Sequence, residues 1–208
     1  GNPSSLHSFG KGASDGMERG REQVAGAINA VPREIVFTSG GTEADNLAVL
    51  GGARRARDRG KGDHVVTTVI EHPAVDKSCA QLEKEGFRIT RLPVGGDGLV
   101  RPDDLKEAVD DGTALVSVMA VNNEIGTIQP VKELAAVAHG AGALFHTDAV
   151  QALGKIPVDV RDWDVDLASF SAHKLHGPKG VGALFVRKGT PLTPLVFGGG
   201  HEWGLRSS

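Results

Sequence analysis

The residue whose type and position most clearly suggest reactivity is a lysine that directly follows an apolar, strand-like run. Lys174 ends the sequence Ser171-Ala172-His173-Lys174 and precedes a turn at Gly177-Pro178. A lysine in this position presents its amine to a ligand at the edge of a sheet. Desolvation and neighbouring cations lower the pKa of such an amine and make it a Schiff-base nucleophile. Read alone, however, Lys174 is also typical of an ordinary solvated lysine.

A second segment, Ser39-Gly40-Gly41-Thr42, lies between a short apolar run and a helical pattern. The free N–H groups at the start of a helix, together with the helix dipole, can hold a phosphate group, and glycines allow close approach. Thr42 can add its hydroxyl group. The segment lacks the lysine of a P-loop, which argues against a nucleotide triphosphatase. An ordinary capped helix after a tight turn is the alternative interpretation.

A third segment places Asp148 at the carboxyl end of the apolar run 143–147. Ligands of open α/β sheets bind at this end of the strands. A carboxylate buried there is costly unless it meets a cation or several hydrogen-bond donors, and a protonated pyridine nitrogen would serve. A helix N-cap explains Asp148 equally well when the segment is considered alone.

These side chains must be positioned by the elements around them. From Glu34 onward, short apolar runs alternate with helical patterns, which predicts an α/β fold with a mostly parallel central sheet. Most of the runs are too uniformly apolar to have one face in water, so we expect helices on both faces of the sheet. Strands are predicted at 34–38, 64–70, 87–92, 114–119, 143–147, 165–170 and 182–186.

Two helices between these strands carry clear signals. One is predicted to begin at Pro102, where Asp103 and Asp104 place negative charge in the first turn. Another begins near Pro130 and ends at the glycines of 140–142. Its apolar stripe at helical spacing consists of Val131, Leu134, Ala135 and Ala138. The 208 residues contain no interdomain linker, and we expect one domain over 1–208.

Composition excludes several classes of function. A net charge of -3 argues against a nucleic-acid-binding surface, and the basic run 54–61 is interpreted as a solvated helix face. The longest apolar stretches, such as 114–121, are too short to span a bilayer, so no membrane role is expected. Cys79 is the only cysteine, and a cytoplasmic location is the default. It shares a helix face with Val75 and Leu82, which predicts a buried thiol.

A phosphate cradle, a partner for a pyridine nitrogen and a Schiff-base lysine are what a protein supplies to pyridoxal 5'-phosphate. At this point the chain resembles the cysteine desulfurase family, which is class V aminotransferase-like and of pyridoxal-phosphate fold type I. The resemblance covers essentially the whole chain. The matching motifs are Gly1-Asn2-Pro3-Ser4-Ser5, Thr38-Ser39-Gly40-Gly41-Thr42-Glu43, Glu71-His72-Pro73-Ala74-Val75, Asn122-Asn123-Glu124-Ile125-Gly126, Asp148-Ala149-Val150-Gln151 and Ser171-Ala172-His173-Lys174.

The resemblance implies roles at the ring of the cofactor. Lys174 forms the internal aldimine and Asp148 pairs with the pyridine nitrogen. Gln151 reaches the phenolic oxygen, and Asn123 lies beside the ring and the substrate carboxylate. His72 stacks on the ring and moves protons, so Lys174 and His72 are the catalytic residues, although His72 could instead cap the helix that follows.

The resemblance also implies that the phosphate group is held by a separate set of residues. These residues are Gly41, Thr42, Ser171 and His173. No metal site is expected. The fold is expected to be the large domain of the fold-type I enzymes.

The implied activity is that of a cysteine desulfurase core. Such an enzyme binds L-cysteine as an aldimine, releases alanine and passes sulfur to an enzyme cysteine as a persulfide. The resemblance implies a homodimer with sulfur-acceptor or scaffold proteins as partners, as in iron–sulfur cluster assembly. We expect the family's N-terminal segment and the C-terminal part with the nucleophilic cysteine to be missing here. Ser208 stands where the family usually has glycine.

Other functions remain open at this stage. Enzymes with different substrate chemistry share the same cofactor motifs, so a selenocysteine lyase or another class V lyase or aminotransferase is the main alternative. A noncatalytic fragment that only binds the cofactor is a second. A nucleotide-binding module that uses 177–182 as its phosphate loop is a third and less favoured one.

Overall fold

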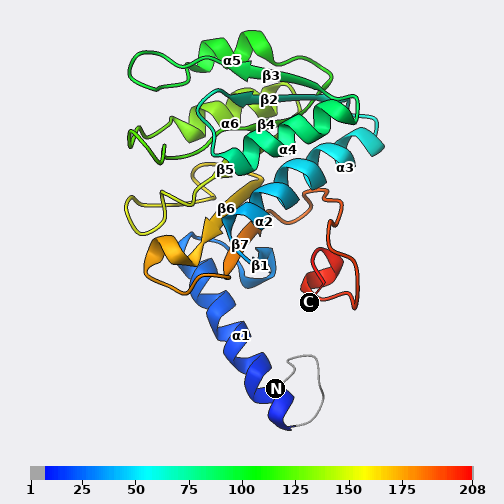
Figure 1. Cartoon of the computed structure of the whole chain (residues 1–208), viewed down its shortest axis with the longest axis vertical. Helices are drawn as coiled ribbons and strands as arrows, with labels where there is room; N and C mark the ends of the chain where they lie inside the picture. The colour runs from blue at the N-terminus through cyan, green and yellow to red at the C-terminus, as the bar shows by residue number, and fades with distance from the viewer. Residues whose placement is uncertain (1–7, 208) are drawn as a thin grey trace.

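The computed structural model describes residues 8–207, and in this part of the chain all the strands form a single seven-stranded sheet (Figure 1). The motif at residues 1–5 and Ser208 lie outside the described residues. The strands are β1 (Ile35–Thr38), β2 (His64–Thr68), β3 (Arg88–Leu92), β4 (Thr113–Ser117), β5 (Leu144–Asp148), β6 (Leu167–Ser171) and β7 (Gly182–Val186). Their order is β1-β7-β6-β5-β4-β2-β3. β7 is antiparallel to both neighbours and the other pairs are parallel, which confirms the predicted α/β class.

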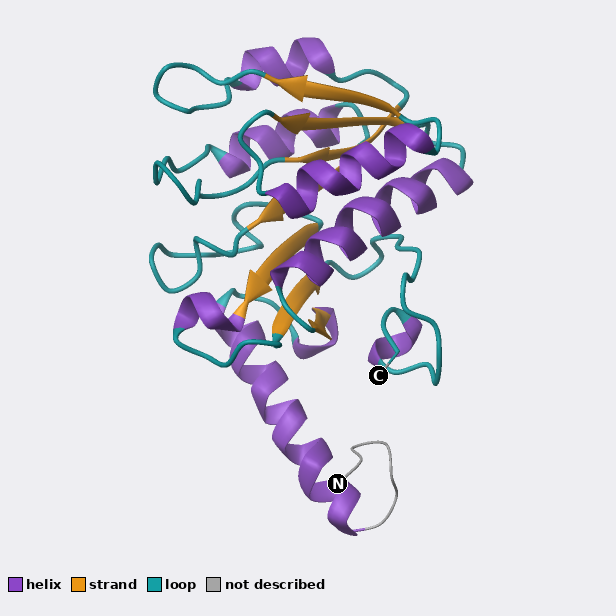
Figure 2. Cartoon of the chain, viewed as in Figure 1, coloured by secondary structure: helices purple, strands orange, loops and turns teal. Residues whose placement is uncertain are grey.

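Helices cover both faces of the sheet, as Figure 2 shows. They are α1 (Ser8–Ala27), α2 (Gly41–Asn46), α3 (Gly52–Asp58), α4 (Pro73–Lys84), α5 (Pro102–Ala108) and α6 (Val131–Gly140). A π-helical turn, Leu47–Gly51, joins α2 to α3 with right-handed helical backbone throughout, so the two form one continuous helix. The sequence patterns did not predict α1, which begins well before the first strand.

Neighbouring residues of each central strand belong to two different cores. Val65 of β2 and Leu115 of β4 pack in the cluster that includes α2, α3 and α4. Val66 and Val116, the next residues along, pack in the cluster with α1, α5 and α6. All four are fully buried. Because side chains alternate across a strand, a sheet covered on both sides needs apolar residues at consecutive positions, and this is the pattern that the sequence shows.

The predicted elements are found close to their expected bounds. α5 begins at Pro102, and the four stripe residues of α6 are all buried. The largest discrepancies are of two residues, and one of them is in β2, which was expected to reach Ile70 and ends at Thr68. The Thr68 hydroxyl accepts the Ile70 N–H at 3.3 Å and donates to Glu71 Oε1 at 2.7 Å, and these bonds turn the chain out of the sheet.

The arrangement brings one end of many strands to a common edge. β2, β4, β5 and β6 are parallel, so their carboxyl ends lie together there. Gly182, the first residue of β7, pairs with both Thr38 and Ser171, which places the end of β1 at the same edge. The segments that contain Gly41, Asp148 and Lys174 all leave the sheet at this edge. Among the described residues, no helix is both long and apolar enough to cross a membrane.

Candidate active site

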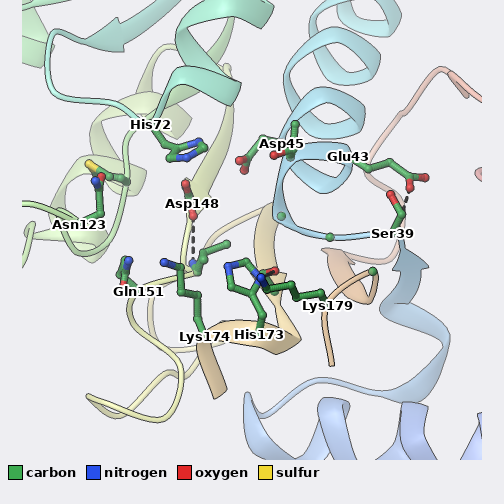
Figure 3. A pocket seen from close by; sticks show the side chains of 17 residues that line it. Ser39, Glu43, Asp45, His72, Asn123, Asp148, Gln151, His173, Lys174 and Lys179 are labelled. Carbon is green, nitrogen blue, oxygen red and sulfur yellow. Dashed lines mark hydrogen bonds between the residues drawn. The ribbon is translucent and has the colours of Figure 1, made fainter. Parts of the chain in front are cut away.

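A cavity of about 440 Å³ opens at the carboxyl edge of the sheet, and Figure 3 shows the side chains around it. Every residue that the sequence singled out for a site lines this cavity. The residues are Gly41, Thr42, His72, Asn123, Asp148, Gln151, Ser171, His173 and Lys174. They come from the ends of five strands and are brought together only by the fold. The roles assigned to them individually remain predictions.

The wall formed by the start of α2 is shaped for close approach of an anion. The Ser39 N–H donates to Glu43 Oε2 at 2.7 Å, and the Thr38 hydroxyl donates to the Gly40 carbonyl at 3.0 Å. A Cβ at Gly41 would come within 2.9 Å of Val150 Cγ2, so a larger residue does not fit there. The first N–H groups of the helix have no partner within it and point out of its start.

The opposite wall carries the hydroxyl, imidazole and amine groups of the segment after β6. The Ser171 hydroxyl and His173 Nδ1 are 2.8 Å apart. Lys174 lies in a short 3-10 helix, Ala172–Leu175, which is closed when the Gly177 N–H donates to the Ala172 carbonyl at 2.9 Å. This tight turn directs the Lys174 side chain into the cavity, where Figure 3 shows its amine on the side of Asp148 and Gln151.

Asp148 forms the floor of the cavity at the last position of β5. It is 5% exposed, and its Oδ1 accepts the Val150 N–H at 2.9 Å. Burial raises the pKa of this carboxyl, while the Val150 N–H and the charge of His72 act in the opposite direction. The alternative interpretation as a helix N-cap does not apply, because turns and no helix follow at 150–155.

His72 caps a helix, which is one of the two roles that the sequence left as alternatives, and its position leaves the predicted role at the ring open. It is the N-cap of α4, where its Nδ1 accepts the Ala74 N–H at 3.1 Å. It also lines the cavity. Since Nδ1 is the acceptor in this bond, the neutral ring carries its proton on Nε2, the other nitrogen. The cap therefore fixes both the tautomer and the orientation of the ring.

Two buried carboxylic acids near this site were not found from the sequence. Asp45 of α2 is 1% exposed and lines the cavity. Glu71 accepts the Met119 N–H at 3.0 Å, and burial raises its pKa to about 8. The available signal for Asp45 was a carboxylate at the start of the strongly apolar run 47–50, a position where burial is expected and charge is not.

Asp45, His72 and Asp148 place ligand atoms within 4.8 Å of one another. Two buried carboxylic acids this close need a cation, a proton or both to offset their repulsion. A metal ion and the protonated ring nitrogen of a cofactor are both cations that would meet this requirement. Comparison with known proteins decides which one the family uses.

The chain matches the aminotransferase class-V family over residues 1–207. It belongs to this family. Class V aminotransferases and cysteine desulfurases are pyridoxal-phosphate enzymes, so the family's cofactor is an organic group and not a metal ion.

Curated relatives of this class V chain are similar over almost its whole length. "Cysteine desulfurase IscS" of Dictyoglomus turgidum is 53% identical over 202 residues, which are 97% of this chain and 51% of the relative. "Cysteine desulfurase, mitochondrial" of Arabidopsis thaliana is 53% identical over 210 residues, which cover 100% of this chain and 46% of the relative. The chain thus spans about half the length of the curated relatives it matches.

Solved structures show the same fold. A protein described as "NIFS-LIKE PROTEIN" superposes with a TM-score of 0.95 at 46% identity and is matched over 57% of its own chain. Another, "SspA in complex with cysteine", also has a TM-score of 0.95, at 41% identity and over 60% of its chain. Both matches cover 100% of the class V chain, which confirms the fold-type I architecture that the resemblance implied.

The side chains of this structure fit pyridoxal phosphate even without the comparisons. The start of α2 offers donors to a dianion beside Gly41, where a Cβ would force Val150 to shift. Asp148 is a buried carboxyl group that forms no ion pair within 8–207, and Lys174 supplies an amine in the same cavity. These are the complements of the phosphate, the ring nitrogen and the aldehyde of the cofactor.

Proposed function

We propose that the full-length protein containing this chain is a pyridoxal-phosphate-dependent cysteine desulfurase, with residues 1–208 forming its cofactor-binding large domain. One observation carries the proposal. Lys174, Asp148 and the start of α2 line a single cavity, in a chain that is 53% identical to a named cysteine desulfurase. L-cysteine is the proposed substrate, with alanine and an enzyme-bound persulfide as products.

In this proposal the phosphate end of the cavity serves to bind and orient. The N–H groups of Gly41 and Thr42 donate to the phosphate, and Thr42 adds its hydroxyl. Ser171 and His173 act from the opposite wall, where their 2.8 Å contact holds both side chains in place. Phosphate bound between these walls fixes the position of the rest of the cofactor.

The ring end of the cavity serves to control charge and protons. Once bound, pyridoxal phosphate supplies an electron sink for the bonds around the substrate α-carbon. Asp148 keeps the ring nitrogen protonated, which strengthens that sink, and Lys174 Nζ provides the covalent attachment. His72 presents an Nε2–H donor to the cavity, and it can pass on a proton only after a second proton on Nδ1 has displaced the Ala74 N–H from the cap. Gln151 and Asn123 supply amide groups at the rim.

Cys79 is not the sulfur acceptor in this proposal. It is fully buried in α4, and burial raises the pKa of its thiol to about 12. A sulfur acceptor needs thiolate character and access to the substrate. The persulfide therefore forms on a cysteine outside residues 1–208.

We further propose that the protein works as a homodimer that passes sulfur to acceptor or scaffold proteins, such as those of iron–sulfur cluster assembly. We also propose a cytoplasmic location for the protein. The relatives of this chain include proteins named as mitochondrial. Size measurement of the full-length protein and cell fractionation test these two points.

The test of the activity is turnover of L-cysteine by the full-length protein. We expect alanine to be released in amounts equal to the sulfur recovered after reduction. L-selenocysteine measured in parallel tests the selenocysteine lyase alternative. Alanine release from selenocysteine alone would replace the proposed substrate, and transamination without sulfur release would replace the reaction.

A further inference from the structure

The buried acid Asp45 has a role that the proposed function does not use. Its carboxyl group is 2% exposed, lines the cavity, and lies beside Asp148 at the ring end (Figure 3). Its Oδ1 atom is buried without a hydrogen-bond partner. An ionised carboxylate with an unpartnered buried oxygen is strongly disfavoured. The protonation state of Asp45 therefore affects the charge that Asp148 presents to a bound cofactor.

The basic group nearest to Asp45 does not neutralise it by charge. The closest basic atom is His146 Nε2, 3.7 Å from Asp45 Oδ1. His146 is fully buried, and burial lowers its pKa to about 3, so it stays neutral. Its two ring nitrogens are occupied by hydroxyl groups, with Ser117 Oγ at 2.8 Å and Ser169 Oγ at 2.9 Å.

The remaining titratable neighbours make ionisation of Asp45 less favourable. Burial raises its pKa well above the ordinary value, the charges of Asp148 and Glu71 raise it further, and a hydrogen bond from Ser169 opposes this only in part. β6 and β7, which pack against α2, carry no charged side chain. A nitrogen of His72 also lies within 4.8 Å of a carboxylate oxygen of each acid.

Asp148 is the better place for the negative charge of the pair. Its Oδ1 accepts the Val150 N–H at 2.9 Å, whereas Asp45 Oδ1 has no partner. It is also the acid that the cofactor's ring nitrogen would meet under the proposed function. The charge of His72 lowers the pKa of Asp148, whereas the charges of Asp148 and Glu71 raise that of Asp45. A proton shared unequally by two close carboxylic acids goes to the one whose anion is less stabilised.

We propose that Asp45 is a positioning residue held as the neutral acid beside Asp148, so that Asp148 alone carries the negative charge that meets the cofactor's ring nitrogen. The cavity floor then presents one anion to one cation. This inference rests on the proposed function for the identity of the cation, but the proton on Asp45 can be measured without any turnover.

The first test is infrared difference spectroscopy on the full-length protein, with and without pyridoxal phosphate. A protonated carboxylic acid has a carbonyl stretching band that a carboxylate lacks. At neutral pH we expect Asp45 and Glu71 each to contribute such a component. Asp45→Asn should remove one and Glu71→Gln the other. Asp76→Asn, the same chemical change at a side chain that is 41% exposed, should remove neither.

The second test is cofactor affinity. Because asparagine imitates a neutral acid, Asp45→Asn should change the dissociation constant of pyridoxal phosphate by less than about threefold. If Asp45 were instead an anion near the ring, its loss would weaken binding by about tenfold or more. An unchanged infrared spectrum combined with such weakening would overturn the inference.

Two features keep this test separate from that of the proposed function. If the protein bound no pyridoxal phosphate, the proposed function would fail while the infrared band of the cofactor-free protein still reported on Asp45. If Asp45→Asn did not fold, the Glu71→Gln protein would still report on the acid band of Asp45. Persistence of this band at neutral pH supports the inference. Absence of any acid band from that protein at neutral pH contradicts it.

Discussion

At the scale of single residues, burial determines which groups react and which only pack. Asp148 and Cys79 are both buried, but Asp148 lines the cavity and Cys79 lies inside α4. A buried anion that lines a cavity attracts a cation, whereas a buried thiol surrounded by apolar atoms stays protonated. We therefore predict that substitution of Asp148 impairs turnover and that substitution of Cys79 does not.

Asp148→Asn should retain most of the cofactor and lose most of its turnover. The amide still accepts the Val150 N–H, but it no longer favours the protonated ring, so electron withdrawal weakens. We expect alanine release by the full-length protein to fall by about 100-fold or more, as when a general electrostatic contribution is removed from an active site. Near-normal alanine production would show that Asp148 is not the partner of the ring nitrogen.

Cys79 should acquire no sulfur during turnover. Mass spectrometry of the full-length protein after incubation with L-cysteine should place the persulfide on another cysteine. Cys79→Ala should keep full activity and lower stability by about 1 kcal/mol, since it removes one small buried group. A reducible added sulfur on Cys79, together with alanine release, would refute the assignment of a purely structural thiol.

At the scale of elements, the sequence predicts more of the fold than of the local turns. The seven strands were predicted because runs such as that of β4 are apolar at consecutive positions, which only a doubly covered sheet requires. The antiparallel direction of β7 was not predicted, because strand direction depends on pairing and leaves no mark in an apolar run. α1 was missed because the residues of 10–27 that are buried, Gly10, Arg21 and Ala25, form no stripe of large apolar residues.

The same contrast holds for the site. The Lys174, Asp148 and Gly41 segments were found because each joins an apolar strand to a polar residue. Asp45 was missed because its burial depends on how α2 packs against β6 and β7, and residues distant in sequence determine that packing. His72 could not be assigned to one role, because its cap and its place in the cavity both follow from the start of α4.

The start of α2 gives a prediction at the element scale. Gly41→Ala places a Cβ within 2.9 Å of Val150 Cγ2 and 3.4 Å of Ser171 Cβ, so the phosphate cradle must move. We expect the affinity for pyridoxal phosphate to fall by about tenfold, the effect of a loss near 1.4 kcal/mol. Gly26→Ala in α1, where a Cβ meets nothing within 4 Å, is the matched control and should bind normally. Equal affinities would remove the start of α2 from the binding site.

At the scale of the whole molecule, a buried ion pair joins the two ends of the described chain. Arg21 of α1 donates to Glu202 at 2.7 and 2.9 Å and to the Ile35 carbonyl at 2.6 Å. Its guanidinium lies between the rings of Phe37 and Trp203. Glu202 also accepts the Phe37 N–H at 2.9 Å, so the pair joins α1, β1 and the segment near the C-terminus.

Removing one partner of this pair should be costly. Glu202→Gln leaves the Arg21 charge buried without its counterion, and we expect the free energy of unfolding to fall by about 3 kcal/mol. Asp162→Asn breaks the exposed pair with Lys132, whose side chains are 58% and 59% exposed, and should cost less than about 1 kcal/mol. Chemical denaturation of the full-length protein measures both, and equal effects would contradict the buried pair's role.

The buried acids give the whole molecule a pH dependence. The pKa of Glu71 is raised from 4.5 to about 8, so between these values the folded state holds a proton that the unfolded state has released. Stability therefore falls as pH rises through this window. Glu71→Gln, which keeps a carbonyl acceptor for Thr68 and Met119, should become more stable relative to the parent by up to about 1.4 kcal/mol per pH unit. A stability difference that does not change with pH in cofactor-free protein would mean that Glu71 is ionised.

The most direct test of the whole account is the location of the covalent bond to the cofactor. The purified full-length protein should be yellow, and borohydride reduction followed by peptide mapping should give a pyridoxyl label on Lys174. Lys179, which lines the same cavity, and Lys155, which contacts Gln151, are the internal controls. A label on Lys174 alone is the predicted result. A label on Lys179 or Lys155 in its place, or no label on a protein that remains colourless with added pyridoxal phosphate, would contradict the account.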